Sequence, residues 1–100
     1  MRSAVITGAA SGLGRELAIA LAKRGYQILI ADINQAGMEK TLDSVRQAGG
    51  DGELYTCDVS KPDEVQGMAD HAFSNGKRVD LLINNAGVFL DSHGSEEAAS

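Results

Sequence analysis

Residues 3–18 read SAVITGAASGLGRELA, an apolar run followed by three glycines and then a helical pattern. The apolar run predicts a strand, and the apolar spacing that begins at Leu13 predicts a helix. Gly8, Gly12 and Gly14 therefore lie where a strand turns into a helix. The first turn of a helix presents unpaired N–H groups and a partial positive charge, which attract phosphate where no side chain blocks the approach. The stretch predicts an anion-binding turn.

Three further short apolar runs are bounded by turn signals and predict strands over residues 26–31, 53–57 and 79–83. Segments with helical spacing separate the runs: one follows Asn34, a candidate N-cap, and one follows residues 60–63, which have capping-box spacing. This alternation predicts βαβ units in a parallel sheet, hence an α/β fold. Right-handed crossovers favour a doubly wound sheet of order 3-2-1-4, with the first two helices on one face and the third on the other.

Length and composition place the chain in one class and exclude others. One hundred residues make a single domain, 1–100, with an ordered core over about residues 2–88 and a polar, acidic loop or frayed tail over 89–100. A net charge of −5 with dispersed cations disfavours nucleic acid, and no apolar run is long enough for a membrane span. The single cysteine, Cys57, fits a small core residue in a reducing compartment. We expect a cytoplasmic protein.

An acid at the end of the second predicted strand indicates which anion the turn binds. Asp32 follows Gly12 by twenty positions, where a carboxylate accepts from the free ribose hydroxyls of a dinucleotide. At about 4 Å and an effective dielectric near 20, one like-charge pair costs about 4 kcal/mol, so a 2′-phosphate is disfavoured. We therefore expect NAD in preference to NADP. The alternatives are a turn whose glycines only permit tight packing, and an Asp32 that only caps the next helix.

Four motifs together resemble those of the short-chain dehydrogenase/reductase family over residues 3–88. They are T7-G8-A9-A10-S11-G12-L13-G14, Asp32, C57-D58-V59 and N84-N85-A86-G87. The resemblance implies a Rossmann-type fold and a cofactor site in four parts. The diphosphate would be lined by Gly8, Ser11, Gly12, Leu13 and Gly14, and the adenosine ribose would be held by Asp32. Adenine would be contacted by Asp58 and Val59. The nicotinamide ribose would be bordered by Asn84, Ala86 and Gly87. Asp58 could instead serve a local turn, and Asn84 and Asn85 could only tether the sheet.

The resemblance also implies an activity, hydride transfer between nicotinamide and a small alcohol or carbonyl substrate. In the family a Tyr, a Lys four residues later and an upstream Ser perform the acid/base chemistry. Neither Tyr26 nor Tyr55 is followed by Lys at the fourth position, so no catalytic residue is expected within residues 1–100. No cluster has metal-ligand spacing, and His71 and His93 are expected at the surface.

Two interpretations of the chain as a whole follow from these observations. The leading interpretation is the cofactor-binding part of a longer enzyme that forms a homo-oligomer, and the alternative is a non-catalytic nucleotide-binding or interaction module complete as given. A relationship to NAD-dependent sugar-nucleotide epimerases is disfavoured by residues 84–87. In the first case, 100 residues alone would be marginally stable or would self-associate along residues 79–83, where an apolar edge is left uncovered.

Overall fold

The computed structural model describes residues 2–85, in which strands and helices alternate as the sequence predicts. In chain order the elements are β1 (Ser3–Thr7), α1 (Gly12–Lys23), β2 (Gln27–Asp32), α2 (Gln35–Gln47), β3 (Asp51–Thr56), α3 (Pro62–Ala72), a short 3₁₀ helix (Ser74–Gly76) and β4 (Leu81–Asn84). The chain beyond residue 85, which includes the predicted tail, lies outside the described residues.

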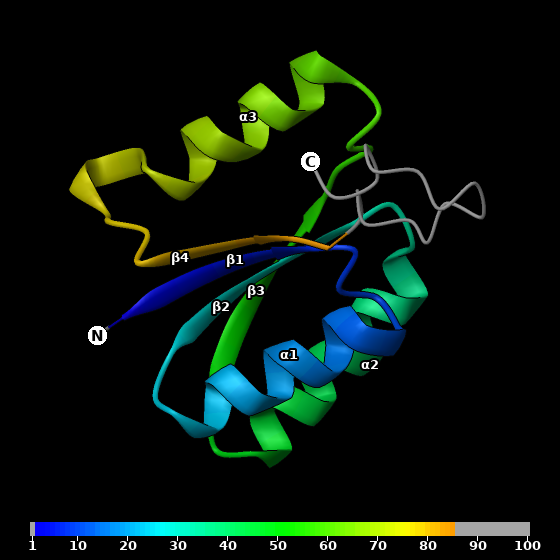
Figure 1. The fold of residues 1–100 in the computed structure, drawn as a ribbon, viewed down its shortest axis with the longest axis vertical. Helices are drawn as coiled ribbons and strands as arrows, with labels where there is room; N and C mark the ends of the chain where they lie inside the picture. Colours follow the sequence, from blue (N-terminus) through cyan, green and yellow to red (C-terminus); the bar gives the residue numbers. More distant parts are fainter. Residues whose placement is uncertain (1, 86–100) are drawn as a thin grey trace, which may run out of the picture.

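The strands form one parallel sheet of order β3-β2-β1-β4, which confirms the predicted doubly wound topology. Figure 1 shows α1 and α2 together on one face of the sheet and α3 on the opposite face. Right-handed crossovers explain this division, because the chain moves from β1 toward β3 in one direction and returns past β1 to β4 in the other. The direction across the sheet reverses between β1 and β4, which are adjacent and parallel, so their carboxyl ends lie side by side.

Alternate side chains of the central strands enter two separate cores. Ala4 and Ile6 of β1 are fully buried against α1 and α2, whereas Val5 lies in the smaller core under α3. Strand β2 repeats the division, with Ile28 and Ile30 on the first side. Strands covered on both faces need apolar residues at every position, which is why these runs show little polar alternation in the sequence.

Strand pairing moves the predicted strand limits. Strand β3 begins at Asp51, which pairs with Gln27, and so it starts two residues before the predicted run of 53–57. Strand β4 begins at Leu81, which pairs with Ala4, two residues after the predicted start at Val79. A neighbouring strand therefore decides these limits more than local hydrophobicity does.

The helix starts confirm one predicted cap and correct another. The side chain of Asn34 accepts a hydrogen bond from the Gly37 amide at 3.1 Å and caps α2, as predicted. The capping box expected over residues 60–63 is not formed, because the N-cap of α3 is Lys61 and its side chain makes no capping bond. Instead the Glu64 carboxylate accepts from the Asp58 amide at 2.8 Å and ties the first turn of α3 to the segment after β3.

The α3 face of the sheet is incompletely covered at β4. Leu82 pairs with Val5 in the sheet and points to the same side, yet it is 61% exposed while Val5 is 3% exposed. An exposed leucine on a parallel strand agrees with the expectation of an uncovered apolar surface within residues 79–83.

Candidate functional site

The three glycines of the turn after β1 meet different structural requirements. Gly8 and Gly12 have positive φ values of 65° and 58°, a region that side chains disfavour. Gly14 lies inside α1, where a Cβ atom would come within 2.2 Å of the Gly8 carbonyl oxygen. Glycine at position 14 therefore lets the helix pack directly on the turn.

The same turn leaves the start of α1 accessible. Ser11 is the N-cap of α1, but its side chain makes no capping bond to the helix amides. A Cβ atom added at Gly12 would meet nothing within 4 Å, and the neighbouring Leu13 is 63% exposed. The first N–H groups of the helix thus face an open surface and can bind a phosphate group. The structure brings these predicted residues together.

Asp32, at the carboxyl end of β2, is held beside the glycine turn by three backbone amides. One carboxylate oxygen accepts from the Ala10 amide at 3.0 Å, and the other accepts from Ile33 at 2.7 Å and Asn34 at 3.0 Å. A carboxylate has about four acceptor positions, so one remains for a further donor such as a hydroxyl. The two amides on its other oxygen belong to residues ahead of α2, and the cap of that helix is Asn34, so Asp32 does not itself cap α2.

A small cavity of about 100 Å³ joins this carboxylate to the end of β3. Its lining residues are Gly8, Asp32, Ile33, Cys57, Asp58 and Val59. Burial is the main cause that raises the pKa of the Cys57 thiol, so this thiol is a neutral wall of the cavity. Cys57 and Ile33 were not predicted as site residues. The apolar positions that directly adjoin Asp32 and Asp58 are the signal that could have identified them.

Hydrogen bonds from Ser60 fix the Asp58 side chain. One Asp58 oxygen accepts from the Ser60 hydroxyl at 2.6 Å and from the Ser60 amide at 2.9 Å. These two bonds, the hydroxyl first, lower the pKa of Asp58 below its ordinary value. Asp58 therefore stays an acceptor at neutral pH. The local turn and the predicted ligand contact are both possible for one carboxylate, since its second oxygen has no bond among the described residues.

The ends of β1 and β4 are tied to each other by side chains. The Thr7 hydroxyl donates to the Asn84 side-chain oxygen at 2.9 Å, and the Asn85 amide group donates to the Gly8 carbonyl at 3.2 Å. These bonds support the sheet-tethering interpretation of the two asparagines and place them beside the glycine turn. Ala86 and Gly87, the other predicted residues of this motif, lie outside the described residues.

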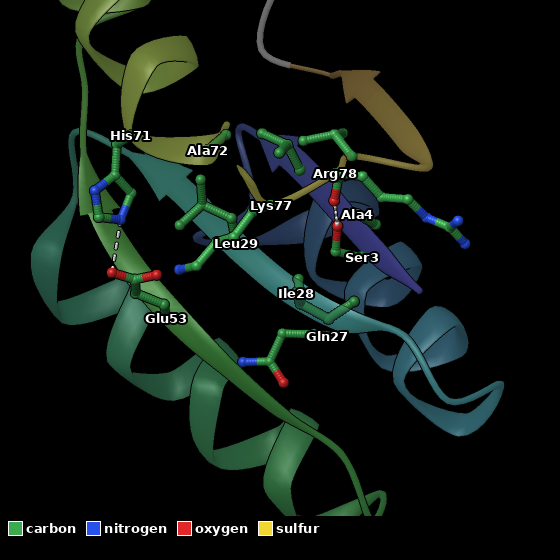
Figure 2. Close-up of a pocket in the computed structure, with 12 residues that line it drawn as sticks. Ser3, Ala4, Gln27, Ile28, Leu29, Glu53, His71, Ala72, Lys77 and Arg78 are labelled. Carbon is green, nitrogen blue, oxygen red and sulfur yellow. Dashed lines mark hydrogen bonds and ion pairs between the residues drawn. The ribbon is translucent and has the colours of Figure 1, made fainter. Parts of the chain in front are cut away.

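A larger cavity lies elsewhere, between the amino halves of the strands and the end of α3. Its volume is about 470 Å³. Figure 2 shows residues that line it, among them the apolar Ala4 and Leu29 and the polar Lys77. His71 lies at the surface, as predicted, where its Nε2 pairs with Glu53 at 2.7 Å and its ring centroid lies 5.1 Å from that of Tyr55 at a tilt of 39°. Open parallel sheets bind ligands at the carboxyl ends of their strands. The cavity at the amino ends is therefore not our candidate site.

The part of the chain that the structure describes contains no group of three or more potential metal ligands. Tyr55 packs against His71 and the core under α3, and Tyr26 packs against the opposite core. Both tyrosines pack against a core as predicted, Tyr55 within β3 and Tyr26 one residue before β2 instead of inside it. Among residues 2–85, no helix combines the length and the apolar character that a membrane crossing requires.

Comparisons with known proteins place these features in a wider group. The family profile described as short chain dehydrogenase matches residues 2–100. The chain is 38% identical over 86 residues to 7alpha-hydroxysteroid dehydrogenase of Escherichia coli, which covers 86% of this chain and 34% of that protein.

Two solved structures have the same fold. Xylitol dehydrogenase bound to NAD+ is 35% identical with a TM-score of 0.80, and actinorhodin polyketide ketoreductase with NADPH is 35% identical with a TM-score of 0.79. Each match covers 86% of this chain and 33% of the other. The chain therefore spans about a third of the length of the relatives that it matches.

Proposed function

Because the chain belongs to the short-chain dehydrogenase family, we propose that it forms the cofactor-binding part of an NAD-preferring oxidoreductase. The reaction proposed is transfer of a hydride between nicotinamide and an alcohol or carbonyl group of a small molecule. The dinucleotide supplies or receives the hydride when bound. The residues of this chain bind and orient the dinucleotide.

Asp32 is the observation that carries the preference for NAD. Its carboxylate is held by three amides at the edge of the candidate site, so it cannot turn away from a ligand without losing these bonds. Free ribose hydroxyls can donate to the acceptor position that remains, whereas a 2′-phosphate brings negative charge to the same place. A like-charge pair at about 4 Å costs about 4 kcal/mol at an effective dielectric near 20, before screening. No cation follows Asp32 directly, because residue 33 is isoleucine.

The remaining residues receive complementary roles. The amides that follow Ser11 bind the diphosphate at the start of α1, and Leu13 covers it with an exposed apolar side chain. Asp58 and Val59 border adenine from the end of β3, within the small cavity that Asp32 also lines. Asn84 and Asn85 hold the end of β4 against the turn, toward the nicotinamide side.

The two solved relatives carry different cofactors, NAD+ in one and NADPH in the other, so family membership leaves the choice open. A calorimetric titration of the full-length native protein with NADH and NADPH is the direct test. We expect tighter binding of NADH, and tighter binding of NADPH would contradict the proposal for Asp32.

The substrate class and the assembly are proposed from the family, and the location is proposed from the single cysteine, which fits a reducing compartment. We propose a small-molecule alcohol or carbonyl substrate, a homo-oligomeric full-length protein and a cytoplasmic location. Light scattering of the full-length protein tests the assembly, since a monomer at working concentration would contradict it.

A further inference from the structure

Arg15 occupies an unusual place for a cation. It lies in the first turn of α1, half-buried, and the first turn contains no acidic residue. Cations in the first turn oppose the helix dipole, so local preference disfavours arginine at this position. Arg15 makes no ion pair with any residue between 2 and 85. Because local electrostatics disfavours Arg15 at this position, contacts elsewhere in the structure must explain it.

The bonds of the guanidinium group supply one. Its Nε donates to the Thr41 hydroxyl at 3.0 Å, and one terminal nitrogen donates to the carbonyls of Ala10 and, at 3.4 Å, of Gly37. All three acceptors are neutral. They belong to the glycine turn and to the first half of α2, so Arg15 connects α1 to both.

Thr41 completes the connection from the other side. This fully buried hydroxyl lies 2.6 Å from the Ala9 carbonyl and 3.2 Å from the Gly37 carbonyl, and it can donate to one of them at a time. At Gly37 a Cβ atom would come within 2.7 Å of the Ala10 carbonyl, which shows how closely α2 packs on the turn.

The turn therefore has two halves with different roles. The backbone of Ala9 and Ala10 is bonded on every side, by Ala31, Asp32, Thr41 and Arg15. Residues 11–14 follow this braced segment and present the uncapped start of α1. Because residues 9 and 10 are held in place, the amides of residues 11–14 keep a fixed orientation.

We propose that Arg15 is a positioning residue for the dinucleotide, an inference that rests on the proposed function. It acts through Ala10, which it holds against α2, and so it keeps the amides of residues 11–14 directed at the diphosphate. Its positive charge, which forms no ion pair among residues 2–85, adds to the attraction of that end of α1 for an anion. Arg15 itself contacts backbone and the Thr41 hydroxyl, so its effect should depend on the phosphates of the ligand more than on the adenosine.

The test compares two ligands and three variants of the full-length native protein. NADH contains the diphosphate and adenosine lacks it, so we would measure the Kd of NADH by fluorescence and that of adenosine by competition. Arg15→Met should weaken NADH binding about tenfold and adenosine binding at most about threefold, since a charge-assisted brace is lost. Arg24→Met makes the same substitution at the exposed end of α1 and should change neither Kd.

Arg15→Lys separates the brace from the charge. A lysine keeps the charge but lacks the planar fork that reaches several acceptors at once, so NADH binding should remain about threefold weaker than in the wild type. This variant also decides the matter if thermal unfolding shows that Arg15→Met does not fold. Wild-type NADH affinity in Arg15→Lys, or equal losses for NADH and adenosine in Arg15→Met, would overturn the inference. Failure of the wild type to bind either NADH or NADPH would instead refute the proposed function.

Discussion

Replacing Asp32 by asparagine tests the charge of the carboxylate while its shape is conserved. The three amides that bind Asp32 approach both of its oxygens, at 3.0 Å from Ala10 and at 2.7 and 3.0 Å from Ile33 and Asn34. An asparagine offers one oxygen and one NH₂ group, so at least one of these amides must face a donor. Leaving one such group without a partner costs about 1–3 kcal/mol, which should appear as lower stability in urea unfolding.

The ratio of the two cofactor affinities is the quantity that reports the charge of Asp32. The repulsion of about 4 kcal/mol between unit charges is reduced by solvent because Asp32 is only half-buried. If about half of it remains, removal of the charge shifts the ratio of the NADPH and NADH dissociation constants by about thirtyfold toward NADPH. Any disturbance of the turn affects both cofactors and cancels in this ratio.

The assay is a fluorescence titration of each cofactor at one ionic strength, in the wild type and in Asp32→Asn. Asp43→Asn is a matched control, because Asp43 is exposed on α2 and has no side-chain bond among the described residues. The control should leave the ratio unchanged. A ratio that stays within twofold of the wild type in Asp32→Asn, while both cofactors bind, would refute the reasoning.

Three further predictions concern the scaffold. Gly14→Ala should lower stability by about 1–3 kcal/mol or more, measured by urea unfolding, because its Cβ would lie 2.2 Å from the Gly8 carbonyl oxygen; wild-type stability would contradict the packing described. Because Asp58 has a lowered pKa, its contribution to stability should be fully present above its unfolded pKa of about 3.9 and should be lost as pH falls through the lower folded value. Asp58→Asn should remove that part of the acid-unfolding profile followed by circular dichroism, and an unchanged profile would exclude the linkage. Leu82→Lys should reduce self-association of the 100-residue chain in sedimentation velocity, since Leu82 is 61% exposed on the α3 face, and a wild-type chain that remains a stable monomer at high concentration would contradict this.

Much of the fold follows from patterns within single segments. The apolar run before Gly8, the helical spacing after it and their repetition are local features, and handedness leaves few ways to connect them. The order β3-β2-β1-β4 was predictable for that reason, as was the cap at Asn34. The displaced start of β3 and the misplaced cap before α3 were not predictable, because pairing with Gln27 and the reach of Glu64 depend on distant or competing partners.

The candidate site divides in the same way. The glycine spacing and the acid twenty positions later predicted that the turn and Asp32 lie together, since a strand-to-helix turn and the end of the next strand meet in any parallel βαβ unit. Only the tertiary structure decided how they are held. Arg15 and Thr41 brace the turn through carbonyls of Ala9, Ala10 and Gly37, contacts across as many as 32 positions that no local pattern encodes. Packing of α2 against the turn creates these contacts, so they exist only once the helix, the turn and the sheet are assembled.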